Sequence, residues 1–200
     1  MGEWAKDGID IFSVQSTFMP KMFSRSNFLF AILFDFGSYR YLTTMNINRV
    51  LVTGATGFIG SALVKSLNSS SNFEVRGAVR GKTLESDASS ITVGDLTQFT
   101  DWAPALDGID VVVHSAARVH IQNDSASDSL DEFRKVNTFG TLNLARQAEE
   151  AGVSRFIFPS TIGVNGTRTT DRRYDADSDV APQSPYAISK HEAELGLLEI

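Results

Sequence analysis

Tyr186 and Lys190 are two residues of this 200-residue sequence whose types and spacing could carry a reaction. They are four positions apart, so on a helix both side chains lie on one face. A lysine ammonium beside a phenol favours the phenolate and lowers the phenol pKa from about 10 toward neutrality, as general acid–base catalysis requires. Pro185 suits the first position of such a helix. An ordinary exposed helix pair has the same spacing, so the interpretation needs support from the rest of the chain.

A glycine-rich turn follows the first apolar run, in the sequence VLVTGATGFIG at residues 50–60, and a helix-forming segment comes directly after it. Strand, glycine loop and helix form the context in which such a loop indicates dinucleotide binding. Gly54 lets the chain turn tightly, Gly57 lets the backbone approach a pyrophosphate at the helix N-terminus, and Gly60 lets the helix lie close to its strand. A plain strand–helix turn is the alternative interpretation.

Two positions after later strands indicate which dinucleotide would bind. Arg80 lies twenty residues past Gly60, where a guanidinium suits the 2′-phosphate of NADP and an acid would suit the ribose of NAD. This favours NADP, although a solvated arginine or one stacked on the adenine has the same sequence pattern. Asp95 follows a short third strand, so its side chain either accepts a bond from the adenine amino group or caps a helix over Thr97–Leu106.

Small and polar residues follow the next two strands. Ala116 and Ala117 leave room for a cofactor against the backbone, and Ser160 and Thr161 end the fifth strand, where catalytic groups of an α/β sheet lie. Asn137 lies on the apolar stripe of a long helix, and because a buried amide must be hydrogen-bonded, it is either a structural link or part of the site.

Apolar strands alternate with helical patterns from Arg49 onward. The expected strands are 49–53, 73–80, 90–93, 108–114 and 155–158, and the expected helices are 58–68, 97–106, 130–152 and 187–200. Sequential strand–helix units predict an α/β fold with a Rossmann-type, doubly wound parallel sheet of strand order 3-2-1-4-5. The polar stretches 124–131 and 167–179 are expected to be loops, the first of them running into a helix start.

Residues 1–44 differ from the rest of the chain. Residues 1–45 hold ten of the twenty aromatic residues and all four methionines, yet they show no sustained helical or strand period. The apolar run 28–34 is too short to span a bilayer and has no cleavage site of the secretory type. We therefore interpret Met45 as the natural start, 1–44 as a poorly ordered extension, and 45–200 as the folded domain.

Composition excludes several classes of protein. The net charge of −6 argues against a nucleic-acid surface. The absence of cysteine excludes disulfides and thiolate metal sites, and it fits a reducing compartment and a cytoplasmic location. The three histidines lack metal-ligand spacing, and neither a metal nor a membrane partner is expected.

The motifs occur in an order that resembles the extended short-chain dehydrogenase/reductase family, in its NAD-dependent epimerase/dehydratase branch. They are TGATGFIG at 53–60, GDL at 94–96, DVVVHSAA at 110–117, Asn137 before GTLN at 140–143, Ser160 with Thr161, and the Tyr186/Lys190 pair. The resemblance covers residues 47–200 and none of 1–44.

This resemblance implies roles for the site residues. Tyr186 would be the acid/base, Lys190 its electrostatic partner on the nicotinamide ribose, and Thr161 the substrate-polarising hydroxyl, with Ser160 as a substitute. It also implies that NAD(P) lies along the glycine loop and the following strand ends, in contact with Gly54, Thr56, Gly57, Phe58, Ile59, Gly60, Arg80, Asp95, Leu96, Ala116, Ala117, Tyr186 and Lys190.

The implied function is an enzyme, an NAD(P)-dependent nucleotide-sugar epimerase that oxidises C4 transiently and reduces it again. Thr161-Ile162-Gly163 lacks the acid pair of the 4,6-dehydratases, and the sequence IGVNG at 162–166 resembles UDP-sugar 4-epimerases. An NADPH-dependent carbonyl reductase and a non-catalytic NAD(P)-binding module are the alternatives. The resemblance also implies a homodimer through helices 130–152 and 187–200.

Family members continue well past the Tyr/Lys helix. C-terminal strands and a substrate domain are therefore expected to be missing after Ile200. The edge beside the fifth strand would then be exposed.

Overall fold

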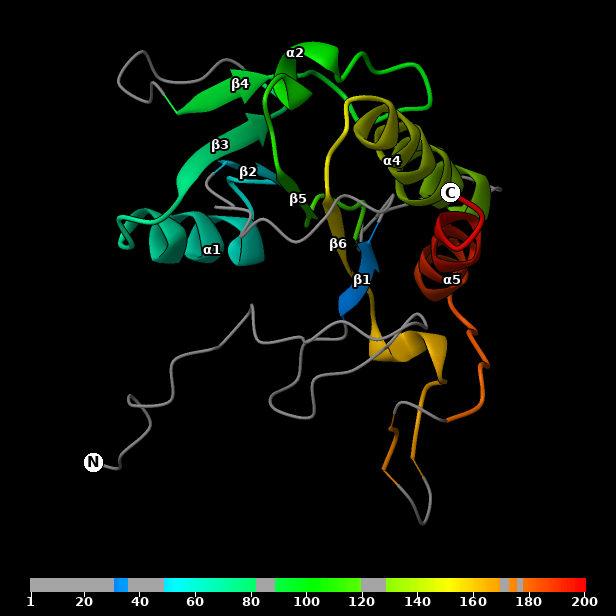
Figure 1. The fold of residues 1–200 in the computed structure, drawn as a ribbon. Coiled ribbons are helices and arrows are strands. Elements are labelled where there is room, and N and C mark those ends of the chain that lie inside the picture. The colour runs from blue at the N-terminus through cyan, green and yellow to red at the C-terminus, as the bar shows by residue number, and fades with distance from the viewer. Residues whose placement is uncertain (1–30, 36–48, 82–88, 120–128, 170–172, 176–177) are drawn as a thin grey trace, which may run out of the picture.

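A single six-stranded sheet organises the chain (Figure 1). The computed structural model describes residues 31–35, 49–81, 89–119, 129–169, 173–175 and 178–200. The strands lie in the order β1-β6-β5-β2-β3-β4. Their bounds are β1 Ala31–Asp35, β2 Arg49–Thr53, β3 Glu74–Val79, β4 Ser90–Thr92, β5 Val111–His114 and β6 Arg155–Pro159.

Five of these strands, β4, β3, β2, β5 and β6, are parallel, which confirms the Rossmann-type order 3-2-1-4-5. The central register sets Val50 opposite both Val75 and Val111. All four residues of β5 are buried, as expected for a parallel strand that is covered on both faces and therefore reads as an unbroken apolar run.

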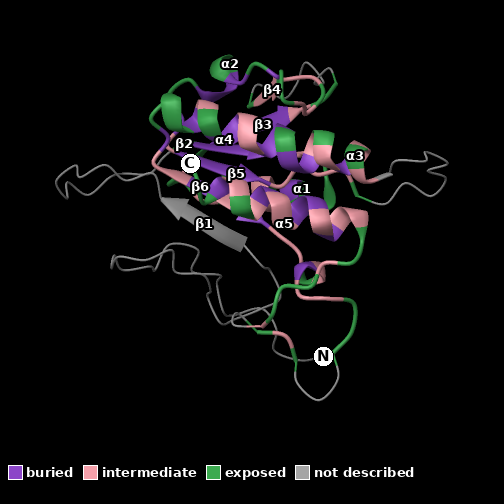
Figure 2. Cartoon of the chain, turned by 90° about the vertical axis from the view of Figure 1, so that its right-hand side faces the viewer, coloured by how far each residue is buried: buried purple, intermediate pink, exposed green. Residues whose placement is uncertain are grey.

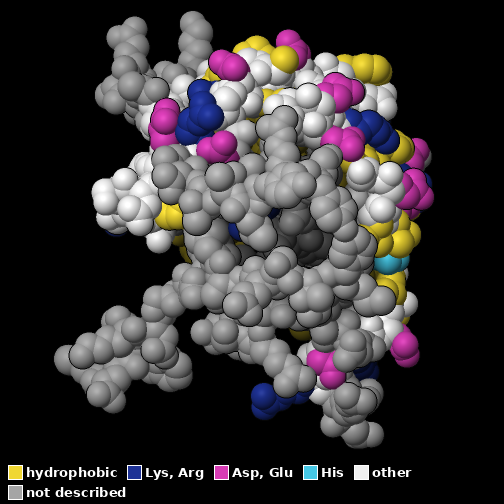
Figure 3. All heavy atoms as spheres, viewed as in Figure 1, with side chains coloured by type: hydrophobic (Ala, Val, Ile, Leu, Met, Phe, Trp, Pro, Cys, Tyr) yellow, Lys and Arg dark blue, Asp and Glu magenta, His cyan; other side chains and the backbone are white. Residues whose placement is uncertain are grey.

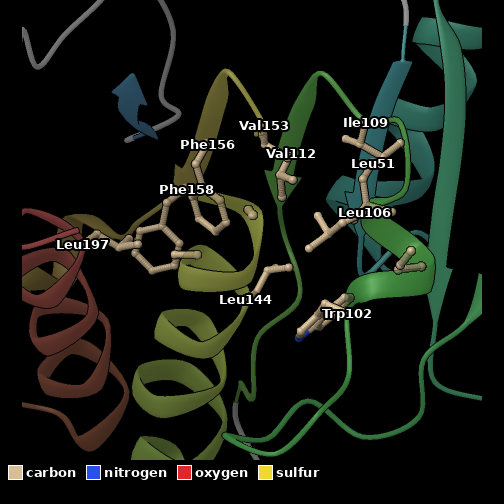
Figure 4. Packing of buried hydrophobic residues seen from close by; sticks show 14 of the residues in the cluster. Leu51, Trp102, Leu106, Ile109, Val112, Leu144, Val153, Phe156, Phe158 and Leu197 are labelled. Atoms are coloured by element: carbon tan, nitrogen blue, oxygen red, sulfur yellow. The ribbon is translucent and has the colours of Figure 1, made fainter. Parts of the chain in front are cut away.

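Helices cover both faces of the sheet (Figures 1 and 2). Their bounds are α1 Phe58–Asn68, α2 Ala103–Leu106, α3 Ser129–Phe133, the π-helix η1 Arg134–Gly140, α4 Thr141–Glu150, the 3₁₀ helix η2 Ile162–Val164 and α5 Pro185–Leu197. Leu67 of α1 packs with Val52 on one face, whereas Trp102, Leu144 and Leu197 pack over the other (Figure 4). The sheet is therefore a middle layer between helices.

The helix predicted over Thr97–Leu106 is wrong in its first half. Only α2, Ala103–Leu106, is helical. The Thr100 hydroxyl donates to the Asp95 carbonyl at 2.6 Å and accepts from the Thr97 backbone N–H at 2.9 Å. These local side-chain bonds satisfy the backbone in a turn and so compete with a helix.

The long helical pattern predicted for residues 130–152 forms three consecutive segments, α3, η1 and α4. The middle segment is a π-helix, which the sequence did not predict, and such segments occur often at functional sites. Gly152 ends the pattern with φ +78°, as predicted for a glycine stop. The last helix begins at Pro185 rather than Ala187, because Ser184 caps it by accepting from the Ala187 backbone N–H at 3.1 Å.

Strand β1 lies within residues 1–44, where the sequence predicted no strand. It pairs antiparallel with β6, with Ala31 opposite Pro159 and Asp35 opposite Arg155. The β6 edge, which was expected to be exposed, therefore has a neighbouring strand from the same chain. Several predictions fall outside the described residues: the rest of the extension 1–44, Met45, and most of the stretch 124–131.

Both acidic and basic side chains lie on the part of the surface that the described residues form in Figure 3. No helix in the described ranges is long and apolar enough to cross a bilayer. The same ranges contain no group of three or more His, Cys, Asp or Glu side chains that could hold a metal ion.

Candidate active site

The glycine loop sits where β2 ends and α1 begins, and its glycines are required by close backbone contacts. Gly54 has φ +64°, and a Cβ there would lie 2.9 Å from the Ala116 backbone. The Gly57 N–H donates to the Gly54 carbonyl at 2.8 Å, which closes the turn. A Cβ on Gly60 would lie 2.1 Å from the Gly54 carbonyl oxygen, so only glycine lets α1 come this close to the loop.

The N-terminus of α1 is suited to an anion. Its N-cap is Gly57, which supplies no side-chain hydrogen bond, and the first turn contains no acid. The first amides of an uncapped helix are free donors and carry the positive end of its dipole. The pyrophosphate of a dinucleotide matches this end. Phe58 is 96% exposed and Thr56 and Ile59 are also exposed, so apolar and polar contacts are both available there.

Arg80 and Asp95 lie at the ends of neighbouring strand segments, and both are largely exposed. The Arg80 Nε is 3.7 Å from a carboxylate oxygen of Asp95. An exposed pair of this kind contributes little stability. The Asp95 side chain therefore faces Arg80 and does not cap α2, whose first turn is bonded instead by Asp101.

The segments after β4 and β5 pack closely on the helices. Leu96 is half-buried and contacts Gly140 of η1, where a Cβ would lie 2.8 Å from the Leu96 side chain. The Ala116 N–H donates to the Thr53 hydroxyl at 3.2 Å, and Ala117 beside it is half-buried. Ala116 thereby packs against the start of the glycine loop, whereas Leu96 packs on η1.

Tyr186 lies in the first turn of α5 and is half-buried, with its ring edge-on to Phe133 at 6.2 Å between centroids. The prediction of a lowered phenol pKa is wrong here. Burial raises the pKa of Tyr186 above its ordinary 10.0, because a phenolate is poorly solvated in this position. Tyr186 is therefore a protonated phenol at neutral pH.

Lys190 is one turn further along α5 and is only 2% exposed. Its Nζ lies 3.5 Å from the centroid of the Phe158 ring, which comes from β6. Burial lowers the pKa of Lys190 from 10.5 to about 7, and the charge of Glu194 partly opposes this change. An ammonium on an aromatic face is favourable but replaces only part of its lost hydration.

The two hydroxyls that end β6 have different surroundings. Thr161 Oγ1 accepts from the Gly163 N–H at 3.2 Å, and within the described residues it donates to no acceptor. The Ser160 hydroxyl donates to the Glu194 carboxylate. Thr161 is thus available to donate to a substrate oxygen, whereas Ser160 is already engaged.

Asn137 is a structural link. It is 1% exposed, and its amide accepts from the Arg118 N–H at 2.8 Å and donates to the Arg118 carbonyl and to Ser189, both at 3.0 Å. The Ser189 hydroxyl donates in turn to the Tyr186 carbonyl at 2.8 Å. Asn137 in η1 thereby joins the segment after β5 to α5, and a part in the site itself stays a prediction.

Two side chains at this end of the sheet were not predicted from the sequence. His114 is fully buried, and its ring nitrogens lie 2.7 Å from the Thr53 hydroxyl and 3.0 Å from that of Thr141. Burial, with a smaller effect of the Lys190 charge, lowers the pKa of His114 to about 3. Glu194 is the second, and its spacing of four from Lys190 was a signal that could have identified it.

A parallel sheet with a glycine loop after its first parallel strand and a Tyr/Lys helix beside its fifth defines a dinucleotide-binding protein of the short-chain dehydrogenase/reductase type. The chain belongs to the NAD dependent epimerase/dehydratase family, whose profile matches residues 50–200.

Relatives of known name support this assignment. The chain is 43% identical over 152 residues to the UDP-glucose 4-epimerase of Vibrio cholerae, covering 76% of this chain and 46% of that protein. A short-chain dehydrogenase/reductase superfamily protein from Agrobacterium tumefaciens with bound NAD superposes with TM-score 0.63 and 30% identity, over 75% and 44% of the two chains. MoeE5 in complex with UDP-glucose and NAD superposes with TM-score 0.64 and 31% identity, over 76% and 48%. The chain thus spans about half the length of these relatives.

Proposed function

We propose that this chain is the cofactor-binding part of an NAD-dependent nucleotide-sugar epimerase that oxidises C4 of the sugar transiently and reduces it again. The observation that carries the proposal is the convergence of three features at the carboxyl edge of one parallel sheet. These are the uncapped N-terminus of α1, the Thr161 hydroxyl after β6, and Tyr186 with Lys190 on α5. Ligands of open α/β sheets bind beyond this edge.

The described residues suit an assignment of roles. Gly163 lies between Thr161 and α5, since a Cβ on it would be 3.5 Å from Thr161 Oγ1 and 3.3 Å from Ala187 Cβ. Thr161 and the start of α5 therefore border the same space. Thr161 would donate to the C4 oxygen, Tyr186 would exchange the C4 proton, and Lys190 would supply positive charge beside it.

The glycine loop and the first turn of α1 would hold the dinucleotide, with Gly54, Gly57 and Gly60 giving the close approach and Arg80, Asp95 and Leu96 bordering the adenine side. When bound, the nicotinamide ring supplies the acceptor and donor of hydride. Lys190, buried on α5, would bind the nicotinamide ribose, and Tyr186 would hold the proton at its phenol oxygen.

NAD is proposed as the working cofactor in preference to NADP, which the sequence favoured. Arg80 already has the Asp95 carboxylate 3.7 Å from its guanidinium, and that negative charge opposes a 2′-phosphate. The structural relatives named above also hold NAD.

A second candidate is a one-way carbonyl reductase at the same site. The raised pKa of Tyr186 favours it, because a phenol that keeps its proton is ready to donate it to a carbonyl oxygen. A non-catalytic NAD-binding module is the third possibility carried over from the sequence, and no contact in the described site favours it.

The first experiment is calorimetric titration of the 200-residue protein with NAD and NADP, followed by incubation with NAD and UDP-galactose and chromatography of the sugar nucleotides. An epimerase forms UDP-glucose without net accumulation of NADH. Tyr186→Phe should retain NAD binding and lower turnover by about 10²–10⁴-fold. Tyr174→Phe is the matched control, because the Tyr174 hydroxyl donates to the Arg168 carbonyl in the segment that follows η2.

Each outcome of this experiment decides between the candidates. Net accumulation of NADH or NADPH-dependent reduction favours the reductase. NAD binding without turnover favours the binding module only when it is also found in a protein of the relatives' full length, because the proposal makes this chain the cofactor-binding part alone. The absence of binding to either dinucleotide contradicts the proposal.

Assembly and location are further proposals. Phe139, Leu195 and Leu198 are exposed apolar side chains on or beside η1 and α5, so these helices are proposed as the surface of a homodimer. A folded unit over 45–200 and a cytoplasmic location are also proposed, the location on the cysteine-free composition alone. Light scattering of the purified protein tests the dimer.

A further inference from the structure

Glu194 lies one turn after Lys190 on α5 and receives donors from two elements. The Ser160 hydroxyl at the end of β6 donates to one carboxylate oxygen. The other oxygen is 3.2 Å from His191 Nδ1, whose ring N–H can donate to it. The Glu194 side chain is only 15% exposed, so its orientation is set by the protein more than by water.

Lys190 needs a counter-charge at this place. Its Nζ lies 3.5 Å from the centroid of the Phe158 ring. Figure 4 shows Phe158 of β6 next to Leu197 of α5, in the layer between these two elements. From β5 the group that faces it is His114, which is neutral at physiological pH because burial lowers its pKa to about 3. Within the described residues, Glu194 is the anionic group whose charge raises the pKa of Lys190.

We propose that Glu194 is a positioning residue of this site: its carboxylate holds the Ser160 hydroxyl at the end of β6 and supplies the counter-charge that favours the ammonium form of the buried Lys190. The effect of Glu194 on catalysis rests on the proposed function, in which Lys190 supplies charge to Tyr186 and to a cofactor ribose. A neutral Lys190 would offer no charge to either. It leaves Thr161 as the hydroxyl that faces the substrate.

A purely structural role is the competing explanation, in which Glu194 only ties α5 to β6. Three variants separate the two roles. Glu194→Gln keeps the size and an acceptor for Ser160 but removes the charge. Ser160→Ala removes the hydrogen bond between Ser160 and Glu194 and keeps the negative charge of Glu194. Glu194→Met also removes the charge and replaces the Gln variant if that variant does not fold.

The measurement is the NMR titration of ¹³C-labelled lysine side chains, without cofactor or substrate, with the Lys190 signal assigned by its loss in Lys190→Met. We expect the Lys190 midpoint to fall by about one pH unit or more in Glu194→Gln, the size of shift caused by a nearby opposite charge. It should stay within about half a unit of wild type in Ser160→Ala, in which that charge remains. The signal of Lys65, exposed on α1 across the sheet, is the internal control.

An unchanged Lys190 midpoint in Glu194→Gln, or an equal fall in Ser160→Ala, overturns the proposal and leaves the structural role. Failure of the proposed function is recognised separately. In that case the wild-type protein binds no dinucleotide in the calorimeter, whatever the lysine titration shows.

Discussion

Gly60 lies so close to Gly54 that a Cβ on Gly60 would be 2.1 Å from the Gly54 carbonyl oxygen. No side chain can occupy that position without moving α1 away from the loop. This contact, six residues apart in sequence, sets the angle at which the helix N-terminus meets the carboxyl edge of the sheet.

Gly60→Ala should therefore lower the free energy of unfolding by about 1–3 kcal/mol, the usual cost of overpacking, and should weaken NAD binding at least tenfold. Gly152→Ala is the control. Gly152 has φ +78° but nothing within 4 Å of its Cβ position, so it should cost about 1–2 kcal/mol of backbone strain and leave NAD binding unchanged. Urea unfolding and calorimetry measure both quantities, and equal losses of binding in the two variants would contradict the loop assignment.

His114 should make the protein less stable below neutral pH. Its pKa is about 3 when folded against 6.5 as the ordinary value, so between these values the unfolded chain binds a proton that the folded protein does not. Stability is then lost as pH falls from 6.5 toward 3, by up to about 1.4 kcal/mol per pH unit. Urea titrations at pH 7 and pH 5 should show a smaller loss in His114→Gln than in wild type, and parallel losses would contradict the prediction.

Lys190 should affect the stability of the protein in a separate, alkaline pH range. Its pKa of about 7 lies below the ordinary 10.5, so its contribution to stability is complete above pH 10.5 and is lost as pH falls toward 7. The slope is at most about 1.4 kcal/mol per pH unit. Lys190→Met should flatten this slope and raise stability at pH 7, as measured by urea unfolding at several alkaline pH values. An unchanged slope would show that Lys190 is not desolvated.

Asp95→Asn should improve binding of NADP relative to NAD, because it removes the carboxylate that lies beside Arg80. A nearby charge at an exposed site contributes about 0.2–1 kcal/mol, so we expect a change of about 1.4- to fivefold in the ratio of the two dissociation constants. Arg80→Ser should shift the ratio the other way. Calorimetry measures both, and no change in either variant would place the 2′ position of the ribose elsewhere.

Strand β1 should protect the edge of β6. The register sets Leu33 opposite Ile157 in the middle of the antiparallel pair, and proline at 33 would remove an N–H and disturb the ladder. In Leu33→Pro we expect amide hydrogen exchange in Phe156–Phe158 to become at least tenfold faster, with β3 unchanged. If β6 exchanges as in wild type, the pairing of β1 does not protect this edge.

The sequence alone determined the elements whose signals are local. The bounds of α1, Phe58–Asn68, were predicted residue for residue, because the glycine loop, the apolar pattern and the polar stop all lie within the segment. The order of the five parallel strands followed from right-handed crossovers. The motif positions from Gly54 to Lys190 could likewise be located, since each follows a predicted strand or lies in or beside a predicted helix.

Tertiary structure decided what depends on burial and on partners distant in sequence. The pairing of β1 with β6 joins segments more than a hundred residues apart, and no local sequence period predicts it. The pKa of Tyr186 rises because neighbouring elements bury the phenol, although the spacing to Lys190 predicted the opposite direction. Ser160 and Thr161 are adjacent hydroxyls in sequence, and only the fold engages one with Glu194 and leaves the other able to donate. The physical reason is the same in each case: solvation and hydrogen-bond partners are properties of the packed chain.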